Sequence, residues 1–90
     1  MTWLVNFSAQ AEKFLKQQRI PKDIIYRLIQ KALMKFRGER ININLKKLGG
    51  VWEGFYRIRK GKVRIMAEFN FDNASVYIEV IDWRGNAYKS

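Results

Sequence analysis

Apolar and basic residues alternate through Phe55–Ile65, and Gly61 interrupts the alternation near its middle. A period of two is typical of a strand that buries one face, and a glycine between two alternating runs indicates a hairpin turn. The pattern therefore predicts two antiparallel strands whose core face carries Tyr56, Ile58, Val63 and Ile65. The opposite face is predicted to carry Phe55, Arg57, Arg59, Lys62, Arg64, Met66 and Glu68.

The basic residues of this hairpin are predicted to face one another. With Lys60-Gly61 as the two turn residues, Arg59 lies opposite Lys62, and Arg57 lies directly opposite Arg64. Like charges placed opposite each other destabilise a sheet by a fraction of a kcal/mol up to roughly 1 kcal/mol. A purely structural hairpin would avoid this cost, so we interpret the row of cations as a binding site for an anion. The alternative is a solvated basic face.

Helical periodicity dominates the first half of the chain. After a short strand at residues 3–7, Ser8 is a suitable N-cap for a helix that extends to about Arg19. Pro21 fits the first turn of a second helix, which Gly38 closes. We expect this helix to cover the sheet of its own domain, although a basic amphipathic helix can also bind a membrane surface or a partner. Its apolar stripe consists of Ile24, Ile25, Leu28, Ile29, Ala32, Leu33 and Phe36.

The second half of the chain reads as a series of strands. Residues 40–48 alternate weakly and fit either an extended connector or an irregular strand. The strand after the hairpin is predicted to reach Phe69, Asp72-Asn73 marks a turn, and Ser75–Ile81 forms a central strand. This order predicts an α+β fold, with an N-terminal strand and two helices on one face of a mainly antiparallel sheet. A length of 90 residues fits a single domain at 1–90.

The charge of the chain points to a polyanionic partner. There are 18 Lys and Arg residues against 8 Asp and Glu residues, a formal net charge of +10. Such an excess favours nucleic acid first and an anionic membrane second, with a generic basic surface as the alternative. The lack of cysteine and histidine removes disulfides, thiolate metal sites and the commonest general base. Without a signal-peptide pattern or an apolar run of membrane length, we expect a soluble cytoplasmic protein.

Many familiar catalytic motifs are missing from the sequence. It has no Walker A loop, no GxGxxG, no nucleophile paired with histidine and no cluster of metal ligands. RNA cleavage requires none of these, because the 2′-hydroxyl of RNA is its own nucleophile and guanidinium groups can stabilise the charge that develops on phosphate. Arginine forks match phosphate in two-point contacts, and an aromatic ring beside them can stack a base. The hairpin is therefore a candidate platform for single-stranded RNA.

Three segments resemble the RelE/ParE superfamily of toxins from bacterial and archaeal toxin–antitoxin systems. They are Asn44–Gly50 (NLKKLGG), Gly54–Ile65 (GFYRIRKGKVRI) and Arg84–Lys89 (RGNAYK), and the last looks closest to archaeal-type RelE. The resemblance implies a microbial-ribonuclease-like α+β fold. In the RelE branch it implies a ribosome-dependent mRNA endonuclease without metal or cofactor, in which the 2′-oxygen attacks the adjacent phosphate in the ribosomal A site.

The resemblance also implies roles for individual residues. Arg57, Arg59 and Arg64 would bind and polarise the scissile phosphate. Arg84 would stabilise charge or protonate the leaving 5′-oxygen, and Tyr88 would orient or stack on the substrate. Contacts to mRNA or ribosomal RNA are expected from Lys46, Lys47, Lys60, Lys62 and Phe55. The implied partners are the ribosome, mRNA and a RelB-like antitoxin that covers the basic face, with no membrane and no small-molecule cofactor.

The identity of the general base is open. Arg57 and Arg59 stand where some family members use lysine, and arginine does not readily release its proton. Trp83 stands where many relatives have histidine, and we expect its ring to pack in the core. The remaining candidates for the base are Glu68 and Lys62.

Two residues near the C-terminus fit more than one place in the predicted fold. Tyr88 fits either substrate contact or C-terminal packing. Gly85 permits a bend in the chain, so we expect Arg84 to lie beyond the last strand. Strand alternation would otherwise group Arg84 with Val76, Ile78 and Val80.

Two other functions are compatible with the same sequence. A ParE-like toxin would keep the fold and inhibit DNA gyrase, and a non-catalytic RelE-like domain would bind RNA without cleaving it.

Overall fold

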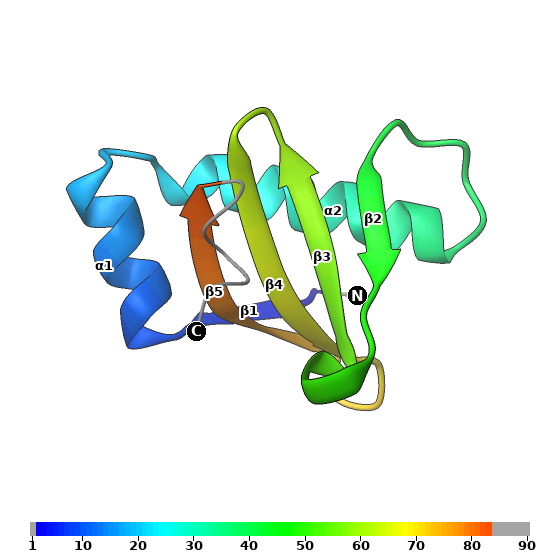
Figure 1. Ribbon diagram of the computed structural model, residues 1–90. Coiled ribbons are helices and arrows are strands. Elements are labelled where there is room, and N and C mark those ends of the chain that lie inside the picture. The colour runs from blue at the N-terminus through cyan, green and yellow to red at the C-terminus, as the bar shows by residue number, and fades with distance from the viewer. Residues whose placement is uncertain (1, 84–90) are drawn as a thin grey trace.

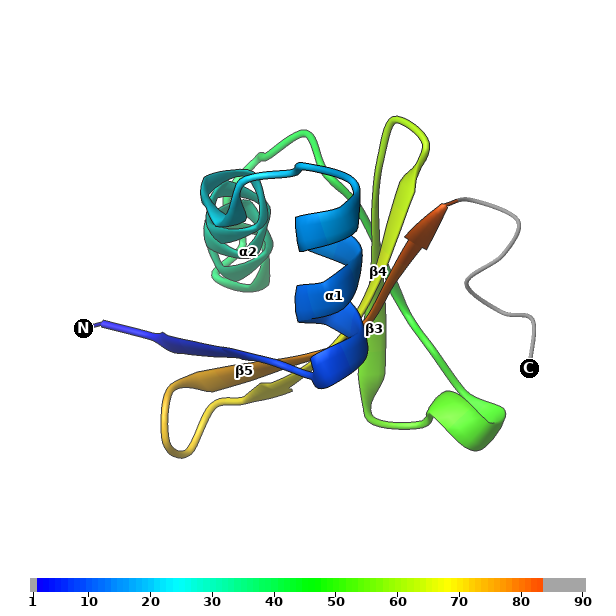
Figure 2. The same ribbon diagram turned by 90° about the vertical axis from the view of Figure 1, so that its left-hand side faces the viewer.

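The computed structural model describes residues 2–83, which form one sheet covered on one face by two helices (Figures 1 and 2). The strand order is β1-β5-β4-β3-β2, with β1 parallel to β5 and all other neighbours antiparallel. This confirms the predicted α+β fold. The elements are β1 (Leu4–Phe7), α1 (Ala9–Gln17), α2 (Lys22–Phe36), β2 (Asn44–Lys47), the short 3-10 helix η1 (Gly50–Trp52), β3 (Phe55–Lys60), β4 (Val63–Asn70) and β5 (Ser75–Trp83).

Ser8 joins β1 to α1 and fixes the start of the helix. Its Oγ accepts a hydrogen bond from the backbone N–H of Ala11 (3.0 Å), which confirms the predicted N-cap, and donates one to the carbonyl of Glu79 (2.6 Å). The helix ends at Gln17, slightly before the predicted end, because Arg19 adopts a left-handed backbone conformation (φ 55°). Ser8 thereby holds α1 against the last strand.

The helix α2 lays its apolar stripe on the sheet, as the sequence predicts. Ile24 is an exception, because it is 41% exposed. Pro21 has an extended backbone (ψ 145°) and is the N-cap, so it lies just outside the first turn and not inside it as predicted. Gly38 follows the helix with φ 89°, which confirms its role as the terminator. The buried residues of the stripe are Ile25, Leu28, Ile29 and Ala32.

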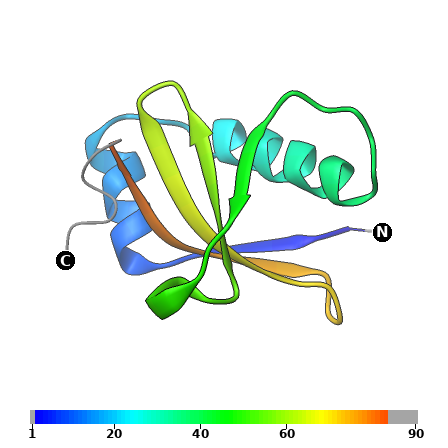
Figure 3. The same ribbon diagram turned by 45° about the vertical axis from the view of Figure 1, so that its right-hand side comes forward.

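The segment at 40–48, in which polar and apolar residues alternate weakly, forms a loop followed by a strand. Asn44–Lys47 form β2, which pairs with β3 at one edge of the sheet. Figure 3 shows β2 beside β3, with the preceding segment returning from the end of α2. Strand pairing of this segment decides which of its side chains share a face with the arginines.

The hairpin between β3 and β4 turns one residue later than predicted. Its two loop residues are Gly61 and Lys62, since β3 ends at Lys60 and β4 begins at Val63. Gly61 has φ 59°, and glycine supplies such a positive φ at the first position of two-residue hairpin loops without steric cost. A type I′ turn at Lys60-Gly61 would need a positive φ at Lys60 as well, whereas the turn at Gly61-Lys62 places the positive φ on glycine alone.

The new register changes the partners of the arginines. Arg59 lies opposite Arg64, and Arg57 lies opposite Met66, so the predicted pairs Arg57–Arg64 and Arg59–Lys62 are wrong. The pairing moves by two residues, and because alternation has a period of two, every strand residue keeps its predicted face. Only Lys62 leaves that face, because it lies in the turn.

A β-bulge interrupts the pairing of β4 with β5. Met66 pairs with Val80 and Ala67 pairs with Ile78, which leaves Glu79 as an extra residue on β5. The carbonyl of Glu79 accepts the Ser8 hydrogen bond described above. The bulge and the N-cap of α1 are therefore joined directly.

The bulge reverses the alternation of β5. Ile81 is buried on the side of the helices, whereas Val80 and Asp82 share the face of Met66 and Arg64, their respective partners. The predicted grouping of Val80 with the core residues before the bulge is therefore wrong. β5 also extends to Trp83, beyond the predicted end. Arg84, whose placement rests on this grouping, lies outside the described residues.

Gln10 of α1 closes the free edge of β5 beyond the bulge. Its side-chain amide donates to the carbonyl of Ile81 (2.9 Å) and accepts from the N–H of Ile81 (3.1 Å). A single side chain thus makes both hydrogen bonds that a neighbouring strand residue would make. Through these bonds α1 holds the last part of β5 in the sheet.

The core fills the space between the sheet and the helices. Ile58, Ile65, Ile78 and Ile81 of the sheet are completely buried there. The Tyr56 ring packs within 4.9 Å of Phe36 and 5.7 Å of Phe69, measured between ring centroids, which confirms Tyr56 as a core residue. With one face of the sheet occupied in this way, the other is left for the polar and basic side chains.

Candidate functional site

A row of polar side chains crosses four strands on the sheet face opposite the helices. Asn44 pairs with Arg59, Arg59 with Arg64, and Arg64 with Asp82, so all four side chains project from the same face. We call this face, with Arg57, Arg59 and Arg64 on it, the arginine face. Two guanidinium groups in directly opposed positions repel each other at a cost of up to roughly 1 kcal/mol, which an anion between them would offset.

A second row lies beside the first on the same face. It runs from Lys46 through Arg57 and Met66 to Val80. Nη2 of Arg57 donates a hydrogen bond to Oδ1 of Asn44 (3.0 Å), which links the two rows. The side chain of Met66 is completely buried. The arginines therefore lie beside a buried apolar side chain on the same face of the sheet.

The three arginines are only partly exposed. The Nε atoms of Arg57, Arg59 and Arg64 are buried, although the residues themselves are of intermediate exposure. Burial of the inner part of a side chain reduces the number of rotamers that it can adopt. Partial burial thus favours arginine forks held at fixed positions, which is the geometry that two-point phosphate binding uses.

The acidic residues of the arginine face differ in their distance from the opposed pair. Asp82 faces Arg64 directly, and its Oδ1 accepts the backbone N–H of Trp83 (2.7 Å). Glu68, a predicted candidate for the base, pairs with Phe55 and lies four residues from Arg64, which is about 13 Å along the strand. Asp82 is therefore the carboxylate in the row of the opposed arginines.

The predicted RNA-contacting residues divide between two faces. Lys46 lies on the arginine face opposite Arg57, whereas Lys47 pairs with Tyr56 and shares the other face of the sheet. Lys60 pairs with Val63, a residue on the side of the core, and so also lies off the arginine face. Of the predicted lysines, the pairing brings Lys46 into the rows of the arginines.

Aromatic side chains frame the arginine face on one side. Phe55 lies on this face and packs edge-on against Trp52 of η1, with ring centroids 5.4 Å apart. Trp83 instead packs against Phe14 of α1 at 5.3 Å and is 36% exposed. The ring of Trp83 therefore packs at the edge of the core, in line with its predicted packing role. Phe55 lies beside the arginines, and Tyr77 shares its row on the same face.

Two polar residues of the site, Asn44 and Asp82, were missed by sequence reasoning. Asn44 belongs to a segment that fitted either a connector or a strand, and only strand pairing places it beside Arg57 and Arg59. Asp82 reaches the arginine face because of the bulge at Glu79, for which the sequence has no clear signal. The predicted site residues Arg84 and Tyr88 lie outside the described residues.

Residues 2–83 contain no group of three or more histidine, cysteine or acidic side chains that could hold a metal ion. Across the same range, no helix is both long and apolar enough to cross a membrane.

Comparison with solved structures gives several matches that extend over most of this chain. The archaeal RelE–RelB complex from Pyrococcus horikoshii OT3 matches with a TM-score of 0.61 at 27% sequence identity, over 97% of this chain and 100% of that chain. The RelB–RelE antitoxin–toxin complex from Methanococcus jannaschii matches with a TM-score of 0.54 at 26% identity, over 88% and 89% of the two chains. The chain therefore has the fold of the RelE-like toxins, in agreement with the resemblance in its sequence motifs.

The same RelE-like fold recurs at lower sequence identity. The toxin–antitoxin complex RelBE2 from Mycobacterium tuberculosis matches with a TM-score of 0.59 at 21% identity, over 93% of this chain and 100% of that chain. No family model matches the sequence, and a search of curated proteins finds no match. The RelE-like assignment of this chain therefore rests on its three-dimensional structure together with the motifs quoted above.

Proposed function

We propose that this chain is the toxin of a type II toxin–antitoxin system and that it stops translation by cleaving mRNA on the ribosome. The observation that carries the proposal is the opposition of Arg59 and Arg64, with Arg57 in the next row, on a sheet face that neither helix covers. The RelE-like fold supports the proposal, because its solved neighbours include toxins in complex with antitoxins.

The proposed reaction uses the substrate's own nucleophile. A base removes the proton of the 2′-hydroxyl, and the 2′-oxygen forms a bond to the adjacent phosphorus. The bond between phosphorus and the 5′-oxygen then breaks, and the 5′-oxygen takes up a proton, which leaves a 2′,3′-cyclic phosphate and a 5′-hydroxyl end. Negative charge grows on the phosphate oxygens during this step, where the forks of Arg59 and Arg64 can donate hydrogen bonds.

The proton transfers need groups other than these arginines, because a guanidinium group does not release its proton in proteins. Asp82 joins Glu68 and Lys62 as a candidate for the base, and it has the advantage of facing Arg64 in the same row. Of the two roles expected for Arg84, we propose stabilisation of the charge on the leaving oxygen, and the protonated base would return its proton to that oxygen. Tyr88 is proposed to orient the substrate.

The proposed partners follow from the same chemistry. Lys46 and Phe55, which share the arginine face, would contact RNA by charge and by stacking, respectively. Lys47, Lys60 and Lys62 would contact ribosomal RNA from outside that face. A RelB-like antitoxin of acidic composition would neutralise the chain, whose formal net charge is +10, in the cytoplasm.

A cleavage assay on ribosomes programmed with a defined mRNA tests the proposal. The purified wild-type chain should produce new 5′ ends at positions in the A site, and Arg59→Ala combined with Arg64→Ala should reduce their rate by about 100-fold or more. Arg27→Ala, at an exposed arginine on α2, is the matched control and should cleave like the wild type.

The cleavage assay, combined with assays of gyrase supercoiling and of RNA binding, distinguishes the alternative functions. Intact mRNA together with inhibition of gyrase supercoiling would replace the proposal by a ParE-like function. Salt-dependent RNA binding without new 5′ ends would replace it by a non-catalytic RNA-binding role.

A further inference from the structure

A third cross-strand row lies on the arginine face, two residues along β4 beyond the row that contains Met66. Phe55 pairs with Glu68, and Glu68 pairs with Tyr77, so the carboxylate of β4 stands between two aromatic side chains from the neighbouring strands. The row continues to Asn6 on β1, which pairs with Tyr77. We call this set the aromatic row. Its chemistry differs from that of the two rows that carry the arginines.

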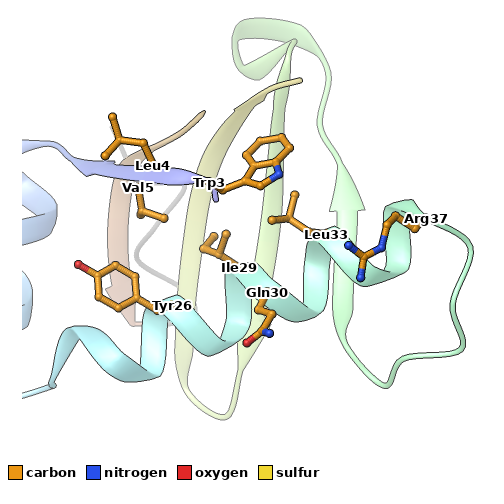
Figure 4. A pocket seen from close by; sticks show the side chains of 8 residues that line it. All are labelled: Trp3, Leu4, Val5, Tyr26, Ile29, Gln30, Leu33 and Arg37. Carbon is orange, nitrogen blue, oxygen red and sulfur yellow. The ribbon is translucent and has the colours of Figure 1, made fainter. Parts of the chain in front are cut away.

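The direction of Asn6 follows from its neighbours on β1. In Figure 4, Val5 projects from β1 toward α2, whereas Leu4 projects away from the helix. A pocket of about 720 Å³ lies on this helix side, between β1 and α2. Because side chains alternate along a strand, Asn6 faces away from the pocket and toward the arginine face, like Leu4. The aromatic row is therefore separate from the pocket and crosses β3, β4, β5 and β1.

The side chains of the aromatic row are accessible from solvent. Tyr77 is 39% exposed, and Glu68 is also exposed. Phe55 is of intermediate exposure, and its edge-on contact with Trp52 limits the orientations that its ring can adopt. Oε2 of Glu68 lies 4.0 Å from where a Cβ on Gly54 would stand, so glycine leaves this side of the carboxylate uncovered. A ligand can therefore reach the two rings and the carboxylate together.

Glu68 is an unexpected residue on a face that suits phosphate. The arginines and Lys46 make this face positive, and a carboxylate repels the phosphates of a nucleic acid. Within residues 2–83, the carboxylate of Glu68 has no hydrogen-bond or ion-pair partner, so it does not neutralise a neighbouring arginine. An ionised carboxylate only accepts hydrogen bonds. The part of a nucleic acid that suits Glu68 is therefore a base that carries N–H donors.

The spacing of the aromatic row suits a single nucleobase. Two inter-strand spacings separate Phe55 from Tyr77, which is about 10 Å between their Cα atoms. A flat base that contacts one ring on each face needs about 7–8 Å between those two rings. A base can therefore enter edge-first between the two side chains, stack on them and direct its edge at the carboxylate of Glu68.

Guanine is the base whose edge matches a carboxylate. Its Watson–Crick edge carries two adjacent donors, the ring N1–H and the amino group, and the two oxygens of Glu68 can accept from both. Adenine and cytosine place their amino group next to an acceptor nitrogen, and uracil flanks its one donor with two carbonyl groups. With each of these three bases, one carboxylate oxygen would meet an acceptor.

We propose that Phe55, Glu68 and Tyr77 form a subsite that binds a guanine base of single-stranded RNA. The subsite lies about 13 Å along β4 from the opposed arginines, farther than a base lies from its own phosphate, so it holds a neighbouring nucleotide. A carboxylate bound to guanine is not free to take the 2′ proton, which leaves Asp82 and Lys62 as candidates for the base of the reaction. This inference rests on the proposed function, to which it adds a base preference.

Binding of labelled RNA to the purified chain tests the subsite without a ribosome. The probes are short fluorescent RNAs whose 2′-hydroxyls are methylated, so that they cannot be cleaved. One probe contains uracil alone, and the others contain a single guanine, adenine or cytosine at the same central position. Fluorescence anisotropy should show that the guanine probe binds about tenfold more tightly than each of the others.

Three variants and a control assign the preference to the aromatic row. Glu68→Gln should reduce the advantage of the guanine probe to about twofold or less, because an amide presents one donor and one acceptor and can pair with any of the four bases. Tyr77→Ala should weaken all probes about fivefold or more through lost stacking, and Tyr77→Phe should restore them. Asp23→Asn removes the same charge from the first turn of α2 and should leave the guanine preference unchanged.

Any other pattern overturns the proposal. Equal binding of the four probes by the wild type, no binding at all, or a guanine preference that survives Glu68→Gln would show that Glu68 does not read a base. The ribosomal cleavage assay gives a separate result. Cleavage without a guanine preference in these probes would sink the subsite alone, and a guanine preference without cleavage would sink the endonuclease and leave the subsite.

Discussion

Oδ1 of Asn44 accepts a hydrogen bond of 3.0 Å from Nη2 of Arg57, and these two residues belong to different strands and to different cross-strand rows. Asn44 pairs with Arg59, whereas Arg57 pairs with Lys46 one row further along β3. The bond therefore turns the Arg57 guanidinium toward the row that contains the opposed arginines. Asn44, a neutral residue on the edge strand β2, therefore helps to position a guanidinium group of the arginine face.

Asn44→Ala should reduce mRNA cleavage about fivefold to tenfold, because an exposed hydrogen bond from a guanidinium group to an amide oxygen contributes about 1 kcal/mol to holding Arg57 in place. Single-turnover cleavage on programmed ribosomes measures the effect, and Asn42→Ala, at an exposed asparagine two residues earlier, is the control. If Asn44 acts through Arg57, the substitution should have no further effect in an Arg57→Ala background. Additive losses in the double variant would contradict this role.

Removing one guanidinium from the opposed pair should lower the salt dependence of RNA binding. Arg59→Gln and Arg64→Gln should each reduce the slope of log K against log salt concentration by roughly one phosphate contact, that is by about 0.7 for single-stranded RNA. Fluorescence anisotropy with a short labelled RNA at several salt concentrations gives the slope. Arg27→Gln on α2 should leave the slope unchanged, and an equal drop in this control would indicate a diffuse basic surface.

Gln10→Ala should destabilise the protein by about 1–3 kcal/mol. The substitution leaves the N–H and the C=O of Ile81 without the side chain that bonds both, in a part-buried position. For a domain of this size each kcal/mol lowers Tm by about 4–8 °C, which thermal unfolding followed by circular dichroism resolves. Gln17→Ala, at an exposed glutamine of the same helix, should shift Tm little; equal shifts would show that Gln10 contributes only helix propensity.

Gly61→Ala should cost about 1–2 kcal/mol, because Gly61 has φ 59° and a Cβ is disfavoured in that left-handed conformation even though nothing lies within 4 Å of it. Denaturant unfolding measures the change. Gly49→Ala is the control, since Gly49 has φ −133° and equally open surroundings. A neutral Gly61→Ala would show that the hairpin can adopt another turn, such as one centred on the preceding residue.

Periodicity alone predicted the fold to a large extent, because the amphipathic stripe of α2 and the alternation of β3 and β4 each specify a buried face. The same periodicity could not choose between registers that differ by two residues, since both keep Arg57, Arg59 and Arg64 on one face. The observed turn at Gly61-Lys62, in which glycine alone takes a positive φ and Lys60 does not, sets Arg59 opposite Arg64. The alternation of the hairpin therefore predicted the shared face of these arginines correctly and their cross-strand pairing wrongly, and the anion site stays a prediction.

The remaining parts of the site depend on contacts between distant segments. The bulge at Glu79 is held by Ser8, which is 71 residues earlier in the sequence, and no local pattern reports such a contact. Asp82 reaches the arginine face through this bulge. Asn44 reaches it through pairing of a strand of four residues, too short to give a clear alternation signal.

The parallel pairing of β1 with β5 has a consequence for the moment at which the arginine face forms. β1 is made first among the strands and β5 last, so a growing chain carries an unpaired β1 until β5 has left the ribosome. Because contacts of such long sequence separation form late, the arginine face is assembled only after most of the chain has been made. Under the proposed function, each molecule would therefore complete its own synthesis before its arginine face could act on mRNA.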